Sequence, residues 1–269
     1  MCDNAAYIKS YLCAHDKALW LKYMYALLRY GILKGNFAFK PDIFALYKYR
    51  YDEHLSHKDD RVWQAFTQSA KGSFHPHALP IGYFQNLTYL QGLDSILHKE
   101  FCLKTPLTAQ NQALKAYIHS LPQSAFLHIR LGDYLEGGTF VRLGSAYYNQ
   151  AVQILKKHLG KAYIFVFSNN IPWCERNAHK YIDFSGLKVE FVKHNDEGNA
   201  AQELELMRAC KHGIMANSTF SWWAAYLNDN PHKIVCMPKY FFNDITRIPQ
   251  SQMIAKQNYI LLDHTWAEI

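Results

Sequence analysis

Apolar positions along the chain follow two different patterns, and the change falls near residues 105–106. Before that point, apolar side chains recur at three- and four-residue spacing over residues 17–33, which predicts an amphipathic helix. No clear strand precedes this segment. A further helix is predicted over residues 86–99, after a stretch that Pro76, Pro80 and Gly82 interrupt.

After residue 106, helical segments alternate with short continuous apolar segments. This alternation is typical of parallel strands covered by helices on both faces. The predicted strands span residues 125–129, 163–167, 188–192, 213–216 and 233–237. The predicted helices span residues 108–120, 145–159, 199–211 and 219–227, with a short one after Pro172. We therefore expect an α/β fold with a doubly wound sheet, whose ligands bind beyond the carboxyl ends of the strands.

The 269-residue chain is 49% hydrophobic and carries a formal net charge of +7. This apolar content excludes a disordered or low-complexity protein, because such chains cannot bury enough apolar surface to offset the entropy of ordering. The length predicts two domains, residues 1–105 and 106–269. The positive charge suits an anionic partner, which can be a phosphate-bearing small molecule, a nucleic acid or an acidic membrane surface.

The six cysteines form no C-x-x-C pair, and the sequence contains no H-E-x-x-H or D-x-D motif. No metal site is therefore expected. Cys174, Cys210 and Cys236 lie in or beside apolar stretches, which predicts buried, reduced thiols and a cytoplasmic location. Neither a signal peptide nor a membrane span is recognisable. The absence of G-x-G-x-x-G and P-loop motifs counts against NAD(P) enzymes and P-loop kinases.

The loop after residues 125–129 begins with an arginine and reads HIRLGDY over residues 128–134. An arginine beside a glycine at a strand exit can present its forked donors to a phosphate while the backbone approaches closely. Asp133 can orient that fork or accept a proton. The alternative is a turn closed by a salt bridge between Arg130 and Asp133, and the spacing fits both interpretations equally.

The loop after residues 213–216 runs directly into a helix and reads NSTFS over residues 217–221. Free backbone N–H groups and the positive end of the helix dipole would face the same point as several small polar side chains, which predicts an anion site. Ordinary N-capping is the alternative, but it accounts for one of these polar residues rather than for all four.

Two further segments carry weaker signals. The FSNNIPW segment, residues 167–173, fits a nucleoside-contacting turn and equally fits ordinary turn chemistry. On the helix over residues 199–211, Glu203 shares a face with apolar residues, whereas Glu205 is expected to be solvated. A buried acid needs a functional reason, although Glu203 can also be a surface acid at the edge of the apolar face. His194 is expected in a surface turn.

These segments, in this order, resemble the alpha-1,2-fucosyltransferases of glycosyltransferase family 11, in particular the bacterial branch found in Helicobacter. Residues 128–134 are similar to the family's H-x-R-R-G-D-Y motif, and residues 167–173 are similar to its F-S-D-D-x-x-W element. Residues 210–227, CKHGIMANSTFSWWAAYL, resemble its last and most specific block. The resemblance covers residues 82–238, well over half of the chain.

The resemblance implies a B-type glycosyltransferase with two Rossmann-like domains and a metal-independent, inverting transfer that needs no cofactor. The implied donor is GDP-fucose, and the implied acceptor is the 2-hydroxyl of a terminal galactose on a lipopolysaccharide or an oligosaccharide. No nucleic-acid partner is implied, and peripheral contact with the inner-membrane surface is expected.

Carried over by position, the resemblance makes Arg130 the residue that binds the GDP diphosphate. The catalytic candidates are Arg130, Asp133 and Glu203, and the general base is left open among Asp133, Glu136 and Glu203. The donor-binding candidates are His128, Arg130, Ser168, Asn169, Asn217, Ser218, Thr219, Ser221 and Trp222.

The sequence departs from the family pattern in three places. Leu131 replaces the second arginine, Asn169 and Asn170 replace the paired aspartates, and no G-G-L-G-N-Q loop precedes residue 17. We therefore expect an incomplete N-terminal domain and weak or absent activity, because a missing central strand exposes unpaired backbone and apolar surface. The alternatives are a catalytically inactive sugar-nucleotide or glycan-binding protein and a basic adaptor for nucleic acid or lipid.

Overall fold

The computed structural model describes residues 49–52, 78–81, 87–131, 138–195, 197–244, 252 and 254–263. The chain divides into two compact units, one of which is Asp3–Cys102 and the other Leu103–Ile269 with the first two residues. The helix predicted over residues 17–33 lies outside the described residues, and the proposed Rossmann-like character of the N-terminal domain stays a prediction.

In the smaller unit, strand β1 (Tyr49–Asp52) pairs in parallel with β2 (Ala78–Ile81). A 3₁₀ helix, η2 (Leu87–Leu90), and an α-helix, α4 (Asp94–Glu100), follow. The continuous helix predicted over residues 86–99 is wrong, because a turn with Gly92 at φ 74° separates these two pieces. Glycine adopts this left-handed conformation without the steric cost that a Cβ would add.

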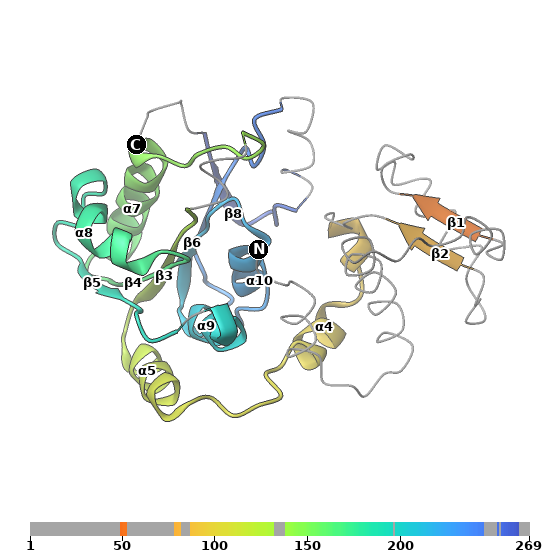
Figure 1. Ribbon diagram of the computed structural model, residues 1–269, viewed down its shortest axis with the longest axis horizontal. Coiled ribbons are helices and arrows are strands. Elements are labelled where there is room, and N and C mark those ends of the chain that lie inside the picture. Colours follow the sequence, from red (N-terminus) through yellow and green to blue (C-terminus); the bar gives the residue numbers. More distant parts are fainter. Residues whose placement is uncertain are drawn as a thin grey trace. The chain divides into compact units, whose positions relative to one another are not determined.

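The larger unit contains a six-stranded parallel sheet, with strand order β5-β4-β3-β6-β7-β8 (Figure 1). All five predicted strands are present, and their ends differ from the predicted ends by one or two residues at most. The sixth strand, β8, was not predicted. The strands are β3 (Ser124–Ile129), β4 (Tyr163–Ser168), β5 (Lys188–Phe191), β6 (His212–Ile214), β7 (Val235–Pro238) and β8 (Tyr259–Leu262).

Helices cover both faces of this sheet, which confirms the predicted α/β class. The helices are α5 (Ala109–Ser120), α7 (Ser145–Leu159), α8 (Ile171–Tyr181), α9 (Ala200–Ala209) and α10 (Thr219–Tyr226), and the 3₁₀ helix η3 (Glu197–Asn199) precedes α9. Helices α7 and α8 pack with Ala125, Leu127 and Ile129 of β3 in one core cluster. On the other face, Tyr117 of α5 meets Phe165 of β4, and α9 packs against both α5 and α10.

The strand order reverses between β3 and β6. From β3 the chain adds β4 and then β5 on one side, and it returns to pair β6 with the other side of β3. A crevice forms at such a reversal because the loops that leave the two neighbouring strands turn to opposite faces of the sheet. The loops that leave β3 and β6 contain the predicted anion-binding residues at 128–134 and 217–221.

Candidate functional site

The exit of β3 holds a neutral histidine next to a charged arginine. His128 is buried, and its ring packs 5.7 Å from the ring of Phe220 in the first turn of α10. Burial, and then the neighbouring charge of Arg130, lower the pKa of His128 to about 3. The imidazole is therefore neutral at pH 7, and half-buried Arg130 supplies positive charge at this strand exit.

The exit of β4 is bonded to the exit of β3 through one side chain. Asn169 Oδ1 accepts a hydrogen bond from Leu131 N at 2.9 Å, and Asn169 Nδ2 donates to Leu131 O at 3.0 Å. Ser168 Oγ accepts from Asn170 N at 3.1 Å, and Asn170 Oδ1 caps α8 by accepting from Trp173 N at 3.1 Å. Asn169 therefore ties the two strand exits together, whereas the Ser168 and Asn170 side chains make bonds within the turn and at the start of α8.

The exit of β6 leads through Ser218 into α10. Ser218 Oγ accepts from Phe220 N at 3.3 Å and serves as the N-cap, while half-buried Thr219 begins the helix. A helix start of this kind directs free N–H groups and positive dipole charge outward. The His128–Phe220 ring contact brings this helix start to the exit of β3.

Three other donor-binding candidates on this loop use their polar atoms on the main chain. Asn217 Nδ2 donates to Val141 O at 2.8 Å and to Phe241 O at 3.1 Å. Ser221 Oγ donates to Ser218 O at 3.2 Å, and Trp222 Nε1 donates to Ile254 O at 2.7 Å. All three residues are buried, so these bonds support the shape of the site. Their predicted contacts with the donor stay predictions.

Asn217 bonds to both segments of an antiparallel pairing between residues 138–143 and 241–243, which the sequence does not predict. Val141 N donates to Phe241 O at 3.0 Å beside an antiparallel bridge between Phe140 and Phe242. Asn243 closes the pair, because its Nδ2 donates to Gly138 O at 2.7 Å and to Phe140 O at 3.0 Å. The two segments lie about a hundred residues apart in sequence, and no periodicity in either one signals the pairing.

Of the two acids of α9, Glu203 agrees with its prediction as an acid beside the apolar face, and Glu205 does not. Glu203 is half-buried, and burial raises its pKa to about 7. Glu205 was predicted to be solvated, which is wrong, because it is buried and its Oε2 lies 2.9 Å from Lys115 Nζ. Helix α9 lies between α5 and α10, so a face that looks polar in the sequence is covered by the neighbouring helix.

His194, at the exit of β5, belongs to a polar network. Its Nε2 forms a hydrogen bond of 2.6 Å with Asn111 Oδ1. Asn111 Nδ2 in turn donates to Asn195 Oδ1 at 2.8 Å and to Gln202 Oε1 at 2.7 Å. This network ties the β5 exit to α5 and α9, which is a structural use for His194. Asp133 and Glu136, two of the three base candidates, lie outside the described residues.

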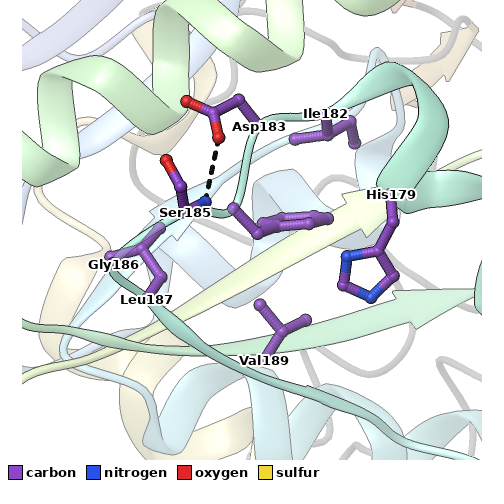
Figure 2. Close-up of a pocket in the computed structure, with 8 residues that line it drawn as sticks. His179, Ile182, Asp183, Ser185, Gly186, Leu187 and Val189 are labelled. Carbon is purple, nitrogen blue, oxygen red and sulfur yellow. Dashed lines mark hydrogen bonds between the residues drawn. The ribbon is translucent and has the colours of Figure 1, made fainter.

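An open hollow of about 500 Å³ lies near the start of β5, away from the carboxyl ends of the strands. Figure 2 shows the side chains that line it. It is lined by His179 of α8, by the turn over residues 182–187 and by Val189 near the start of β5. Hydrogen bonds from Ser185, and then from Lys156, hold the pKa of Asp183 at about 2. The hollow contains none of the predicted site residues, which follow the carboxyl ends of the strands.

Cysteine burial agrees with the prediction, since Cys174, Cys210 and Cys236 are free thiols in the core. In the part of the chain that the structure describes, no group of three or more His, Cys, Asp or Glu side chains is arranged to hold a metal ion. No helix among those residues is long and apolar enough to cross a bilayer.

Comparison with known proteins identifies a family whose model covers the whole six-stranded sheet. The family model described as Glycosyl transferase family 11 matches residues 80–262, more than half of the chain. An Escherichia coli protein named O-antigen biosynthesis glycosyltransferase WbnK is 31% identical over 168 residues, which cover 60% of this chain and 54% of that protein. An E. coli alpha-1,2-colitosyltransferase is 28% identical over 185 residues, covering 66% of this chain and 61% of that protein.

Similarity extends to mammalian proteins. Galactoside alpha-(1,2)-fucosyltransferase 2 of Oryctolagus cuniculus is 28% identical over 188 residues, covering 62% of this chain and 52% of that protein. The chain thus spans about half to three fifths of the length of these curated relatives. With the family model matched over every described strand of the larger unit, the chain belongs to glycosyl transferase family 11.

Proposed function

We propose that this chain is part of a glycosyltransferase that moves fucose from GDP-fucose to the 2-hydroxyl of a terminal galactose in a glycan. The observation that carries the proposal is the adjacency of the β3 exit, which bears Arg130, and the start of α10, joined by the 5.7 Å contact between His128 and Phe220. Relatives named as alpha-1,2-fucosyltransferases and as an alpha-1,2-colitosyltransferase support the choice of sugar and linkage.

Arg130 and the first turn of α10 would stabilise the departing diphosphate. Transfer from a nucleotide sugar builds negative charge on the diphosphate as the bond to the sugar breaks, while the sugar becomes cation-like. A guanidinium and fixed backbone N–H groups already oriented toward that charge lower the barrier without having to reorganise during the reaction. This assignment needs no metal ion, and metal-independent transfer is what the family resemblance implies.

The acceptor hydroxyl would lose its proton to a carboxylate. Among the three candidate bases, Glu203 lies within the described residues. Burial raises its pKa to about 7, so its carboxyl group is partly ionised at neutral pH and can accept a proton. Asp133 and Glu136 remain candidates from the sequence. A single displacement on the face opposite the diphosphate would invert the configuration at the sugar carbon.

Binding and transfer assays on the full chain test this function. GDP and GDP-fucose are titrated calorimetrically, and transfer to a galactose-terminated oligosaccharide is followed by mass spectrometry. We expect Arg130→Ala to weaken GDP binding by about tenfold to a hundredfold, the loss of one charged hydrogen-bonding group. The matched control is Arg176→Ala, which removes an exposed arginine from α8 and should leave GDP affinity unchanged.

The outcomes separate the alternatives. Failure of the wild-type chain to bind GDP, or equal losses in Arg130→Ala and Arg176→Ala, would overturn the assignment of the site. Nucleotide binding without transfer to any galactoside would instead identify a catalytically inactive sugar-nucleotide-binding protein. Transfer of a sugar from a different GDP-sugar would keep the site and change the donor.

A further inference from the structure

Arg130 lies between two fixed points of the backbone. On its amino-terminal side, β3 and β4 are paired up to Ile129 and Ser168, the last residues of the two strands in register. On its carboxyl-terminal side, both main-chain polar groups of Leu131 bond to the Asn169 side chain, at 2.9 Å and 3.0 Å. The side chain of Leu131 is also buried in the core cluster.

The Asn169 amide reproduces the hydrogen bonding of one more strand residue. A backbone residue in a ladder offers one N–H and one C=O to its neighbour, and an asparagine side chain offers the same donor and acceptor pair. The pairing of β3 with β4 therefore extends past the end of both strands. The backbone on both sides of Arg130 is held in place while its guanidinium stays outside the ladder.

We infer that Asn169 is a positioning residue for Arg130, acting on the diphosphate site through the Leu131 main chain and not by touching the nucleotide. The inference rests on the proposed function, since it assigns a role within that site. Only asparagine satisfies both groups from this position. Aspartate lacks the donor for Leu131 O, and glutamine moves the amide outward by one methylene group.

The neighbouring asparagine provides a matched control. Asn170 lies in the same turn, but its side chain faces α8, where Oδ1 accepts from Trp173 N and caps the helix. Asn170→Ala should lower the unfolding midpoint and leave GDP affinity unchanged. Asn169→Ala should weaken GDP binding by about tenfold, the net effect of two lost hydrogen bonds.

Two measurements separate positioning from direct contact. In a double-mutant cycle, the variant with both Arg130→Ala and Asn169→Ala should bind GDP no more weakly than Arg130→Ala alone. The reason is that the Asn169–Leu131 hydrogen bonds affect GDP binding only through Arg130. Hydrogen exchange at the Leu131 amide should speed up in Asn169→Ala and stay at the wild-type rate in Asn170→Ala. Asn169→Asp keeps the acceptor for Leu131 N, so amide protection there should be restored.

The possible results test the role of Asn169 separately from the proposed function. Additive losses in the double variant would show that Asn169 contacts the nucleotide directly and would overturn the inference. Unchanged GDP affinity in Asn169→Ala, with Arg130→Ala still defective, would overturn it while leaving the proposed function standing. A wild-type chain that binds no GDP would overturn both, and the exchange data would then report only on the fold.

Discussion

The ring of Phe126 in β3 lies directly against the backbone of Gly213 in β6, its register partner across the point where the strand order reverses. A Cβ atom at residue 213 would collide with this ring. Because Phe126 is only 1% exposed, core side chains surround the ring and it cannot move away. Glycine at this position therefore allows the two central strands to pair beneath an aromatic side chain.

We expect Gly213→Ala to lower the free energy of unfolding by about 1–3 kcal/mol, the usual cost of overpacking a close-packed core. Urea denaturation measures the change. Adding Phe126→Leu to Gly213→Ala should recover part of the loss, because a smaller side chain leaves room for the methyl group. No recovery in the double variant would show that the cost does not arise from this contact.

Stability should depend on pH through His128. Its pKa is about 3 in the folded protein against an ordinary value of 6.5, so the unfolded chain binds the proton more tightly. The contribution of neutral His128 to the free energy of unfolding is therefore fully present above pH 6.5. It is lost as the pH falls from about 6.5 toward about 3. Within that window the contribution changes by about 1.4 kcal/mol per pH unit.

Replacing His128 with glutamine should remove this part of the pH dependence. Urea unfolding at pH 7 and pH 5 gives the slope for each protein. Phe220→Leu, which removes the ring contact but keeps the imidazole, serves as the control and should keep the wild-type slope. Equal slopes in His128→Gln and the wild type would contradict the assignment of this pH dependence to His128.

Lys115 should stabilise the fold through buried Glu205. Lys115→Met leaves the carboxylate with Arg208 Nη1 at 3.6 Å and removes the shorter contact of 2.9 Å. Because the Lys115 side chain is 32% exposed, we expect a loss of about 1–3 kcal/mol in unfolding free energy, less than for a fully buried pair. Thermal or urea unfolding provides the measurement.

The exposed pair of Lys193 with Glu175 is the control for that prediction. Lys193 is 63% exposed in this ion pair, so Lys193→Met should cost less than about 1 kcal/mol. Similar losses in the two lysine variants would mean that burial of Glu205 does not set the strength of its ion pair.

Asn217→Ala should release the wall formed by residues 138–143 and 241–243. The substitution removes the hydrogen bonds that the Asn217 amide donates to Val141 O and Phe241 O in a buried region. We expect the free energy of unfolding to fall by about 2 kcal/mol. Amide exchange should speed up at Val141 and Asn243, whose N–H groups bond across the wall to Phe241 O and Thr139 O. Protection should stay unchanged at buried Val166 in β4, and a uniform rise in exchange would instead indicate global destabilisation.

The sequence by itself determined the class of the fold and the places where chemistry can occur. Helical and continuous apolar segments alternate because strands such as β3 and β7 are buried on both faces and helices on one, so five strands could be located to within two residues. Strand β8 was missed because it lies about twenty residues beyond β7 and its signal is four apolar residues, too short to show a period.

Only the tertiary structure decided how those places come together. The strand order puts Arg130 beside the start of α10, and no local pattern in the chain encodes which strands are neighbours. The same holds for the partners of polar side chains, since Asn169 bonds to Leu131 and Glu205 to Lys115 across 38 and 90 residues of sequence. Hydrogen bonds and ion pairs depend on distance in space, whereas periodicity reports only burial along one element.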